Sequence, residues 1–246
     1  MTGFVVHPRN AMVLAAGLGL RLRPITEMMP KPLVLVAGRT MLDRVLDALD
    51  AVGVTTCVVN THYLGHMIAS HLEHRKRPAI HVSPEDELLD TGGGVAKVLP
   101  RLGSAPFYTV NADILWEEGP GTPALARLAE AFDDATMDGL LLVVPLGRAV
   151  GYDGKGDFNL DAGSRLIRRG TAPSADFVFT GVQILHPRLF MGHPDGAFSL
   201  NRLYDQAIAG GRLRGLVHVG RWFHIGTVEG LQLAEAGLEP QPRVPP

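Results

Sequence analysis

The sequence has few of the features that mark a secreted, membrane-spanning or nucleic-acid-binding protein. Its 246 residues include a single cysteine, Cys57, which excludes an intramolecular disulfide framework and is compatible with a reducing cytosol. There is no charged-then-apolar leader, and no apolar run reaches the about 18 residues of a membrane-spanning helix. The formal net charge of −2 provides no positive field for nucleic acid. We therefore expect a cytoplasmic protein that binds neither nucleic acid nor a membrane.

The apolar content is sufficient for one large α/β core, because 46% of the residues are hydrophobic. Several apolar runs lack strict alternation, as expected of strands that are covered on both faces. These runs lie at 11–16, 54–59, 106–111 and 139–144. Helical spacing recurs between them, at 42–52, 64–74, 94–102 and 122–134. Strands that alternate with helices predict a Rossmann-like, doubly wound sheet with parallel strands.

The chain after residue 151 has a different pattern. Short runs punctuated by glycine, GDFNLDAG, SRLIRRG and DFVFTGVQIL, predict a small antiparallel insertion over the sheet, which would make the fold mixed. The chain then returns through a helix at 200–210, a strand at 215–219 and a helix at 228–236. We expect one domain, with a tail at 1–10, halves at 11–113 and 114–236, and a flexible, proline-rich tail at 237–246.

Residues 14–33, LAAGLGLRLRPITEMMPKPL, are the most informative segment. Prolines prevent it from forming a regular helix, because each removes an N–H donor and biases the preceding residue towards extended structure. Gly17 and Gly19 allow backbone N–H groups to approach a ligand, and Arg21 and Lys31 add fixed positive charge. This combination suits a polyphosphate. The segment therefore predicts an anion-binding loop after a buried strand.

Two better-known phosphate loops do not fit this segment. The dinucleotide-binding pattern G-x-G-x-x-G lacks its last glycine here and runs into Pro24, and the P-loop pattern is absent. A lone G-x-G also fits a strand-ending turn with solvated arginines. Such a turn, however, does not require the full spacing G-x-G-x-R-x-x-P-x-T-x-x-x-P-K-P-L.

That full spacing resembles the sugar-1-phosphate nucleotidyltransferases. Further matches follow in order, at Thr91-Gly92-Gly93-Gly94, Asn111-Ala112-Asp113, Phe179-Thr180-Gly181 and Gly226-Thr227, so the resemblance covers roughly residues 11–236. It implies a GT-A-like nucleotidyltransferase fold with a nucleotide-binding first half and a sugar-binding second half. It also implies a reaction in which a sugar 1-phosphate attacks the α-phosphorus of an NTP and pyrophosphate leaves.

The resemblance extends to a branch of the family. LLDTGGGVAKVLPRLGSAPFYTVNADI, GKGDFNL and LHPRLF…PDGAFSLNRL are similar to the branch that joins UTP to N-acetylmuramate 1-phosphate in peptidoglycan recycling. Alternatives with the same chemistry are mannose 1-phosphate with GTP and phosphocholine with CTP. An alternative of another class is a catalytically weak regulatory protein that binds a nucleotide sugar.

The resemblance also implies roles for individual residues. Arg21 would hold the β- and γ-phosphates, Lys31 would bridge the α-phosphate and the incoming phosphate, and Asp113 would bind Mg²⁺, with Mn²⁺ as a second possibility. From its position alone, Asp113 could equally be a helix cap or turn residue. The predicted nucleotide-binding residues are Ala15, Ala16, Gly17, Gly19, Arg21, Lys31, Asn60, Gly92, Gly93 and Asn111. The predicted sugar-binding residues are Asp157, Thr180 and Gly181.

Two departures from the family pattern stand out. His224 occupies the place of the family's second metal-binding Asp, and imidazole is a poor ligand for Mg²⁺ but a fair one for Mn²⁺, Co²⁺ or Zn²⁺. His224 could bind the metal, donate to a phosphate, reflect impaired activity, or simply be a half-buried histidine with a satisfied hydrogen bond. The Glu-Lys-Pro run that many relatives use on the sugar phosphate is also absent, and Lys155, Arg168 or Arg169 could replace its lysine. The expected partners are an NTP and a sugar 1-phosphate, and the expected state is a monomer or homodimer.

Overall fold

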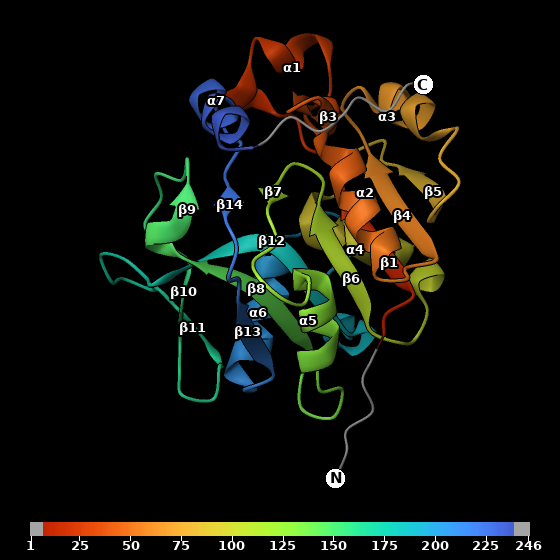
Figure 1. Ribbon diagram of the computed structural model, residues 1–246. Helices are drawn as coiled ribbons and strands as arrows, with labels where there is room; N and C mark the ends of the chain where they lie inside the picture. Colours follow the sequence, from red (N-terminus) through yellow and green to blue (C-terminus); the bar gives the residue numbers. More distant parts are fainter. Residues whose placement is uncertain (1–6, 239–246) are drawn as a thin grey trace.

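The protein was analysed as a computed structural model that describes residues 7–238 (Figure 1). One mixed sheet forms its centre, with the strand order β11-β10-β12-β6-β1-β4-β5, and with β8 paired to β12 and β13 paired to β8. This arrangement confirms the predicted α/β class. Of the predicted tail at 1–10 and flexible tail at 237–246, residues 1–6 and 239–246 lie outside the described residues, whereas Asn10 begins a strand and Gly237 ends a helix.

The first half of the chain supplies parallel strands. β1 lies between β4 and β6, β5 pairs with β4, and all of these pairs are parallel. The bounds are β1 Asn10–Leu14, β4 Thr56–Thr61, β5 Ala79–Pro84 and β6 Phe107–Asn111. Three predicted apolar runs fall on β1, β4 and β6. Parallel strands end at the same edge of a sheet, so the residues that follow them are brought together there.

The antiparallel strands of the second half lie within the sheet. β12 (Phe177–Leu185) pairs with β6 on one side and with β8 (Gly139–Pro145) on the other. β10 (Phe158–Leu160) and β11 (Leu166–Arg168) extend the sheet beyond β12, and β13 (Leu213–Val217) runs parallel to β8. The expectation that DFVFTGVQIL forms a ribbon over the sheet is therefore wrong. Most of this nine-residue strand is buried, as in a central strand that is covered on both faces.

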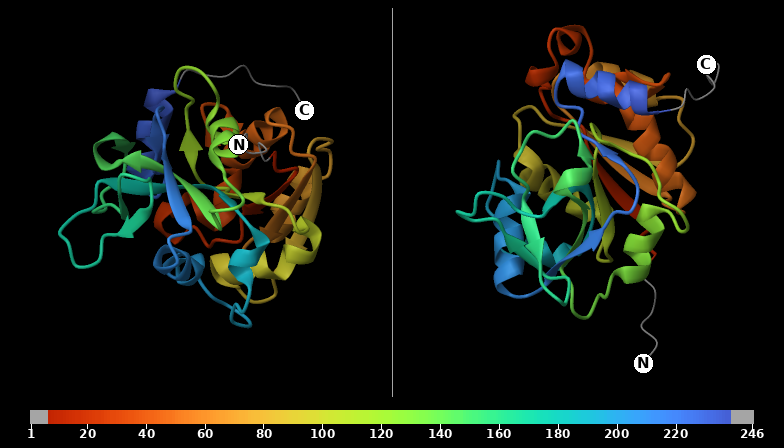
Figure 2. Two further views of the ribbon diagram at one scale, coloured as in Figure 1. Left: turned by 90° about the horizontal axis from the view of Figure 1, so that it is seen from below. Right: turned by 60° about the vertical axis from the view of Figure 1, so that its left-hand side comes forward.

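Helices cover both faces of the sheet (Figure 2). α2 (Met41–Ala51), α3 (Gly65–Leu72) and α5 (Ala124–Ala131) pack on one face, and α4 (Asp90–Leu102) and α6 (Leu200–Ala209) pack on the other. β1 shows the division, because Ala11 and Val13 join the first core whereas Met12 joins the second. Cys57 is buried in the first core, and burial raises the pKa of its thiol to about 12. No helix within residues 7–238 combines the length and apolarity needed to cross a membrane.

The loop segment at 15–40 forms a small lobe above this sheet. It contains single helical turns at Leu20–Leu22, Ile25–Met28 (α1) and Lys31–Leu33, followed by a hairpin of β2 (Leu35–Val36) and β3 (Arg39–Thr40). α7 (Val228–Gly237) packs on the segment through a third apolar core, which includes Leu22, Val36 and Leu231. Beside it, β7 (Leu115–Trp116), β14 (Trp222–Phe223) and β9 (Ala149–Val150) form a three-stranded sheet. The lobe therefore combines a segment from the N-terminal part of the chain with the C-terminal helix α7.

Candidate active site

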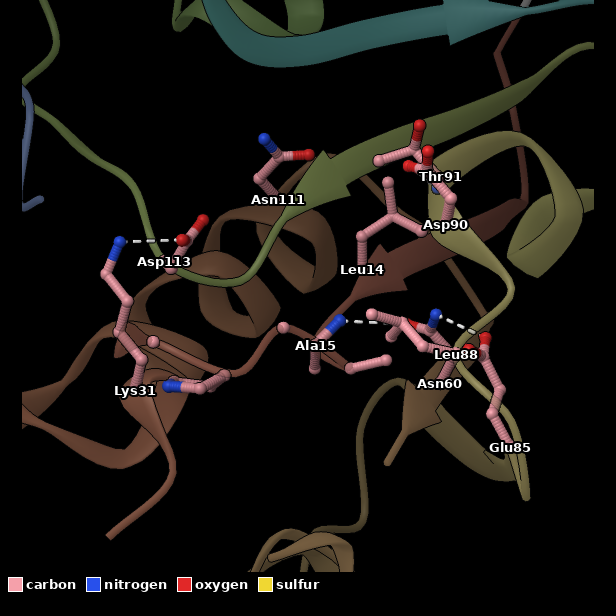
Figure 3. Close-up of a pocket in the computed structure, with 14 residues that line it drawn as sticks. Leu14, Ala15, Lys31, Asn60, Glu85, Leu88, Asp90, Thr91, Asn111 and Asp113 are labelled. Carbon is pink, nitrogen blue, oxygen red and sulfur yellow. Dashed lines mark hydrogen bonds and ion pairs between the residues drawn. The ribbon is translucent and has the colours of Figure 1, made fainter. Parts of the chain in front are cut away.

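A cavity of about 220 Å³ opens at the carboxyl ends of β1, β4 and β6 (Figure 3). Most of the predicted nucleotide-binding residues line it, whereas Arg21 lines an adjoining hollow and Gly92 and Gly93 lie in the helix behind. The lining residues are Leu14, Ala15, Ala16, Gly17, Gly19, Lys31, Pro32, Asn60, Glu85, Leu88, Asp90, Thr91, Asn111 and Asp113. The sheet topology therefore brings together the loops that the sequence analysis singled out.

The loop after β1 presents unpaired backbone donors. Within the described chain, the N–H groups of residues 16–19 make no hydrogen bond to protein. Gly19 has a φ of +64°, and a Cβ there would lie 3.1 Å from Thr26 Cγ2 and 3.2 Å from Lys31 Cβ, so the turn favours glycine. The Thr26 hydroxyl donates to the Gly19 carbonyl at 2.8 Å and fixes the turn. Successive free N–H groups in a fixed loop form a suitable anion-binding surface.

Lys31 and Asp113 form an ion pair at the mouth of this loop. Lys31 Nζ lies 2.7 Å from Asp113 Oδ2, and the two side chains are 11% and 37% exposed. Arg21 lines the same adjoining hollow as both residues, together with Gly226. The positive charges predicted to hold phosphates thus face one carboxylate across a small space. Asp113 follows β6, which places it where sites form in such sheets.

A buried polar network, in which Glu85 was not predicted from the sequence, forms the opposite end of the cavity (Figure 3). The Ala15 N–H donates to Asn60 Oδ1 at 2.8 Å, and Asn60 Nδ2 donates to Glu85 Oε1 at 2.8 Å. Glu85 Oε2 accepts from the Leu89 N–H at 3.0 Å, and Glu85 is only 5% exposed. The network ties the ends of β1, β4 and β5 to the start of α4. The signal was weak because β5 is a half-buried edge strand without a continuous apolar run.

The triple glycine lies in the first turns of α4, which begins four residues earlier than the predicted helix. Its members closely approach other parts of the protein. A Cβ on Gly92 would lie 2.3 Å from Phe198 Cε2, and one on Gly93 would lie 2.4 Å from the Gly196 carbonyl oxygen. The N–H groups of both glycines donate to the Phe198 carbonyl, at 2.8 and 3.1 Å. Neither glycine is among the residues that line the cavity, so their direct contact with the base remains a prediction.

His224 lies half-buried beside Lys31 and Arg21, the cations that are predicted to bind phosphate. Burial, followed by the positive charges of Lys31 and Arg21, lowers the pKa of its imidazole, so the neutral form is favoured. Its ring lies 5.6 Å from that of Tyr152 and 5.8 Å from that of Trp222. Within the described chain the imidazole ring makes no hydrogen bond to protein. The alternative that His224 is a half-buried histidine with a satisfied hydrogen bond is therefore not supported.

The predicted sugar-side residues lie on and beside β12. Asp157 Oδ2 accepts from the Phe179 N–H at 2.9 Å. Thr180 is fully buried, and its hydroxyl donates to the Leu142 carbonyl at 2.8 Å. Gly181 has a φ of +84°, and a Cβ there would lie 2.8 Å from Asn111 Nδ2. The side chains of Asp157 and Thr180 therefore have structural partners, and Gly181 leaves room for Asn111, while their contacts with the sugar remain predictions.

The three cations proposed for the sugar phosphate differ in their partners. Arg168 Nε pairs with Asp205 at 2.7 Å, and Arg169 donates to the Gly156 and Ala172 carbonyls, both at 3.2 Å. Lys155 forms no ion pair within the described chain. Of the three, Lys155 would have to give up the fewest protein contacts to reach a phosphate.

The site offers a carboxylate and an imidazole to a metal. Among the described residues, no group of three or more His, Cys, Asp or Glu side chains could hold an ion by itself. Asp113 has one carboxylate oxygen outside its pair with Lys31. A single carboxylate completed by phosphate oxygens and waters is the donor set that Mg²⁺ accepts. The residues therefore fit an ion that arrives with a nucleotide.

Known proteins share both the sequence and the fold. Residues 10–152 match the nucleotidyl transferase family. The chain belongs to this family. It is 39% identical, over 94% of its own length and 97% of the relative's, to an N-acetylmuramate alpha-1-phosphate uridylyltransferase of Caulobacter vibrioides. A protein of the same name from Neisseria meningitidis serogroup B is 34% identical, with 92% and 97% covered.

The fold agrees with this assignment. The structure of an inositol-1-phosphate CTP transferase from T. maritima superposes with a TM-score of 0.77 at 17% identity, covering 96% of this chain and 100% of that one. At this identity the likeness shows a shared fold. The nucleotidyltransferase fold and the enzyme class that the sequence motifs predicted are both confirmed.

Proposed function

We propose that this nucleotidyltransferase joins UTP to N-acetylmuramate 1-phosphate, giving UDP-N-acetylmuramate and pyrophosphate. The observation that carries the proposal is the identity of 39% and 34% to two relatives of that name, each over nearly its whole length. The free loop amides beside Arg21 and Lys31 suit the triphosphate. We place the enzyme in the cytoplasm, where it would return a cell-wall sugar to nucleotide-activated form.

The proposed reaction is an in-line displacement at the α-phosphorus. An oxygen of the sugar 1-phosphate forms the new bond to the α-phosphorus, and the bond to pyrophosphate breaks. The loop amides and Arg21 would hold the β- and γ-phosphates, because a planar guanidinium suits bidentate contact. Lys31 would bridge the α-phosphate and the incoming phosphate as a compact point charge. No covalent intermediate is needed, so the residues act by positioning and by charge stabilisation.

Asp113, together with phosphate oxygens of the substrate, would hold a divalent metal, with Mg²⁺ favoured and Mn²⁺ possible. Such an ion, when bound, supplies Lewis-acid stabilisation of phosphoryl charge. Lys31 would then leave its pair with Asp113 and turn to the phosphates, so the substrate would replace the carboxylate as its partner. His224 would contact the metal's coordination shell, directly or through a water, as a neutral imidazole.

The substrate pair can be tested by pyrophosphate release from a grid of NTPs and 1-phosphates, with Mg²⁺ and Mn²⁺ in parallel. UTP with N-acetylmuramate 1-phosphate is expected to give the highest kcat/KM. Asp113→Asn protein, purified in the same way, provides the blank for contaminating activity. Turnover confined to GTP with mannose 1-phosphate would contradict the proposed substrates and leave the reaction type intact. Absence of release from every pair would contradict the proposed activity itself.

His224→Asp is expected to raise the activity with Mg²⁺ relative to the activity with Mn²⁺, compared with wild-type protein. A carboxylate is the harder ligand, and substitutions around a metal commonly change its affinity by about 10–100-fold. The measurement is the ratio of kcat/KM values with the two metals, for wild-type and variant protein. His224→Gln is the matched control, since it removes the imidazole without adding charge. An unchanged ratio in His224→Asp would place the imidazole outside the metal's surroundings.

A further inference from the structure

A second hollow, of about 200 Å³, lies between α2, β3 and the segment that directly follows Asp113. α2 packs against both β3 and β7 (Figure 1). The polar part of its wall consists of Arg39, Arg44, Asp47 and Glu118, and the indole of Trp116 completes it. None of these residues belongs to the substrate cavity described above. Two arginines and two carboxylates balance in formal charge, but within the described chain the Nε donors of both arginines have no hydrogen-bond partner.

Both carboxylates of the hollow already have partners. Asp47 pairs with Arg39, and its other oxygen lies 2.7 Å from Arg75 Nη2. Glu118 Oε1 accepts from Trp116 Nε1 at 2.8 Å, and Glu118 Oε2 accepts from the Ala124 N–H, at the start of α5, at 2.7 Å. Among the described residues neither carboxylate pairs directly with Arg44, although both contribute negative charge to the wall.

Among the described residues, Arg44 is the cation of this wall that does not pair directly with a carboxylate. Its Nη2 donates to the Val36 carbonyl at 2.6 Å, and within residues 7–238 it forms no ion pair. Its Nε is buried without a hydrogen-bond partner, as is the Nε of Arg39. Burial, followed by the charge of Arg39, lowers the pKa of Arg44, and the nearby charge of Asp47 opposes this shift. A half-buried guanidinium beside a second one is unfavourable unless an anion joins them.

We propose that this hollow binds a phosphate-class oxyanion, held between the guanidinium groups of Arg44 and Arg39. Guanidinium forks match the oxygens of a phosphate in spacing and charge. The volume accommodates orthophosphate or pyrophosphate. Ile114 and Leu115 line the same hollow and follow Asp113 in the chain, so an ion bound here would touch the segment that carries the catalytic carboxylate. This site is separate from the substrate site and does not depend on the proposed substrates.

The two tryptophans of the chain are cross-strand neighbours in β7 and β14, so variants at each site, and not the choice of tryptophan, distinguish the two sites. Trp116 lines the proposed hollow, and Trp222, which packs against it, lies near His224. We would label the full-length protein with 5-fluorotryptophan and assign the two ¹⁹F resonances with Trp116→Phe protein. The labelled protein would be titrated with orthophosphate and, separately, with pyrophosphate, in the absence of metal.

The proposal expects a saturable shift of the Trp116 resonance with at least one of the two anions. In Arg44→Gln protein the midpoint should rise about tenfold or more, because a charged hydrogen-bond donor is lost. Gln can still donate to the Val36 carbonyl, and a circular-dichroism spectrum and thermal unfolding midpoint close to those of wild-type protein would verify the fold. Arg148→Gln, an exposed arginine outside the hollow, is the matched control, and Lys31→Ala protein should keep the Trp116 response.

Other outcomes would overturn the assignment. A Trp116 response that survives in Arg44→Gln protein, or disappears in Lys31→Ala protein, would assign the binding to the substrate site. A shift that rises linearly without saturation would show an adventitious ion only. Comparison of the two titrations identifies the favoured anion. Of the two, pyrophosphate is released by the proposed reaction, whereas orthophosphate is not.

Discussion

Lys31→Ala protein is expected to lose about 10²–10³-fold in kcat, the effect of removing one well-placed donor from a charge-stabilised transition state. The substitution removes the cation assigned to the α-phosphate. It also frees Asp113, whose Oδ2 lies 2.7 Å from Lys31 Nζ, so an unpaired carboxylate would face the incoming phosphates. The measurement is steady-state pyrophosphate release at saturating substrates.

A double variant and a control variant help to interpret the loss of kcat in Lys31→Ala protein. The double variant Lys31→Ala/Asp113→Ala should lose less than the product of the single losses, because residues in direct contact are not additive. Lys76→Ala, an exposed lysine in the connection between α3 and β5, should keep wild-type turnover. Wild-type kcat in Lys31→Ala protein would show that the ion pair is only structural and that another group holds the α-phosphate.

The position of Lys31 and Asp113 illustrates what the sequence alone could predict. Asp113 follows an apolar run, and the ends of parallel strands share one edge of the sheet, so its place in the crevice followed from local pattern and topology. The loop could be recognised because its glycines, prolines and cations keep a fixed spacing. Both features depend on residues that are close together in the sequence, so both can be recognised without knowledge of long-range contacts.

Features set by distant partners were not predictable in this way. The run DFVFTGVQIL has the same alternation in an edge ribbon and in a central strand, and its pairing with both β6 and β8 decides between them. Glu85 looks like any exposed acid in a turn. Its burial depends on the amide of Asn60 and on the Leu89 N–H, which the sequence does not place beside it. Such polar networks can be identified only from the structure, in which the fold brings the strand ends together.

The triple glycine gives the second large expected effect. Gly93→Ala should destabilise the protein by about 1–3 kcal/mol, because its Cβ would lie 2.4 Å from a backbone carbonyl that no side-chain rotation can move. The KM for the NTP should also rise. Thr91, in the cavity wall, accepts from the Leu200 N–H at 3.0 Å, so the loop that Gly93 would displace also supports that wall. Urea unfolding and NTP-dependent kinetics measure the two effects.

Gly92 and Gly93 differ in their contact with Phe198. The Cβ of Gly92→Ala would meet the Phe198 ring at 2.3 Å, whereas that of Gly93→Ala would meet the Gly196 carbonyl. Phe198→Ala should therefore couple with Gly92→Ala in a double-mutant cycle and leave the cost of Gly93→Ala nearly unchanged. Gly147→Ala, where a Cβ meets no atom within 4 Å, serves as the control and should change the free energy of unfolding by less than about 0.5 kcal/mol. Equal coupling for both glycines would contradict the different contacts assigned to them, whereas a raised KM without any loss of stability would favour the predicted direct contact with the nucleobase.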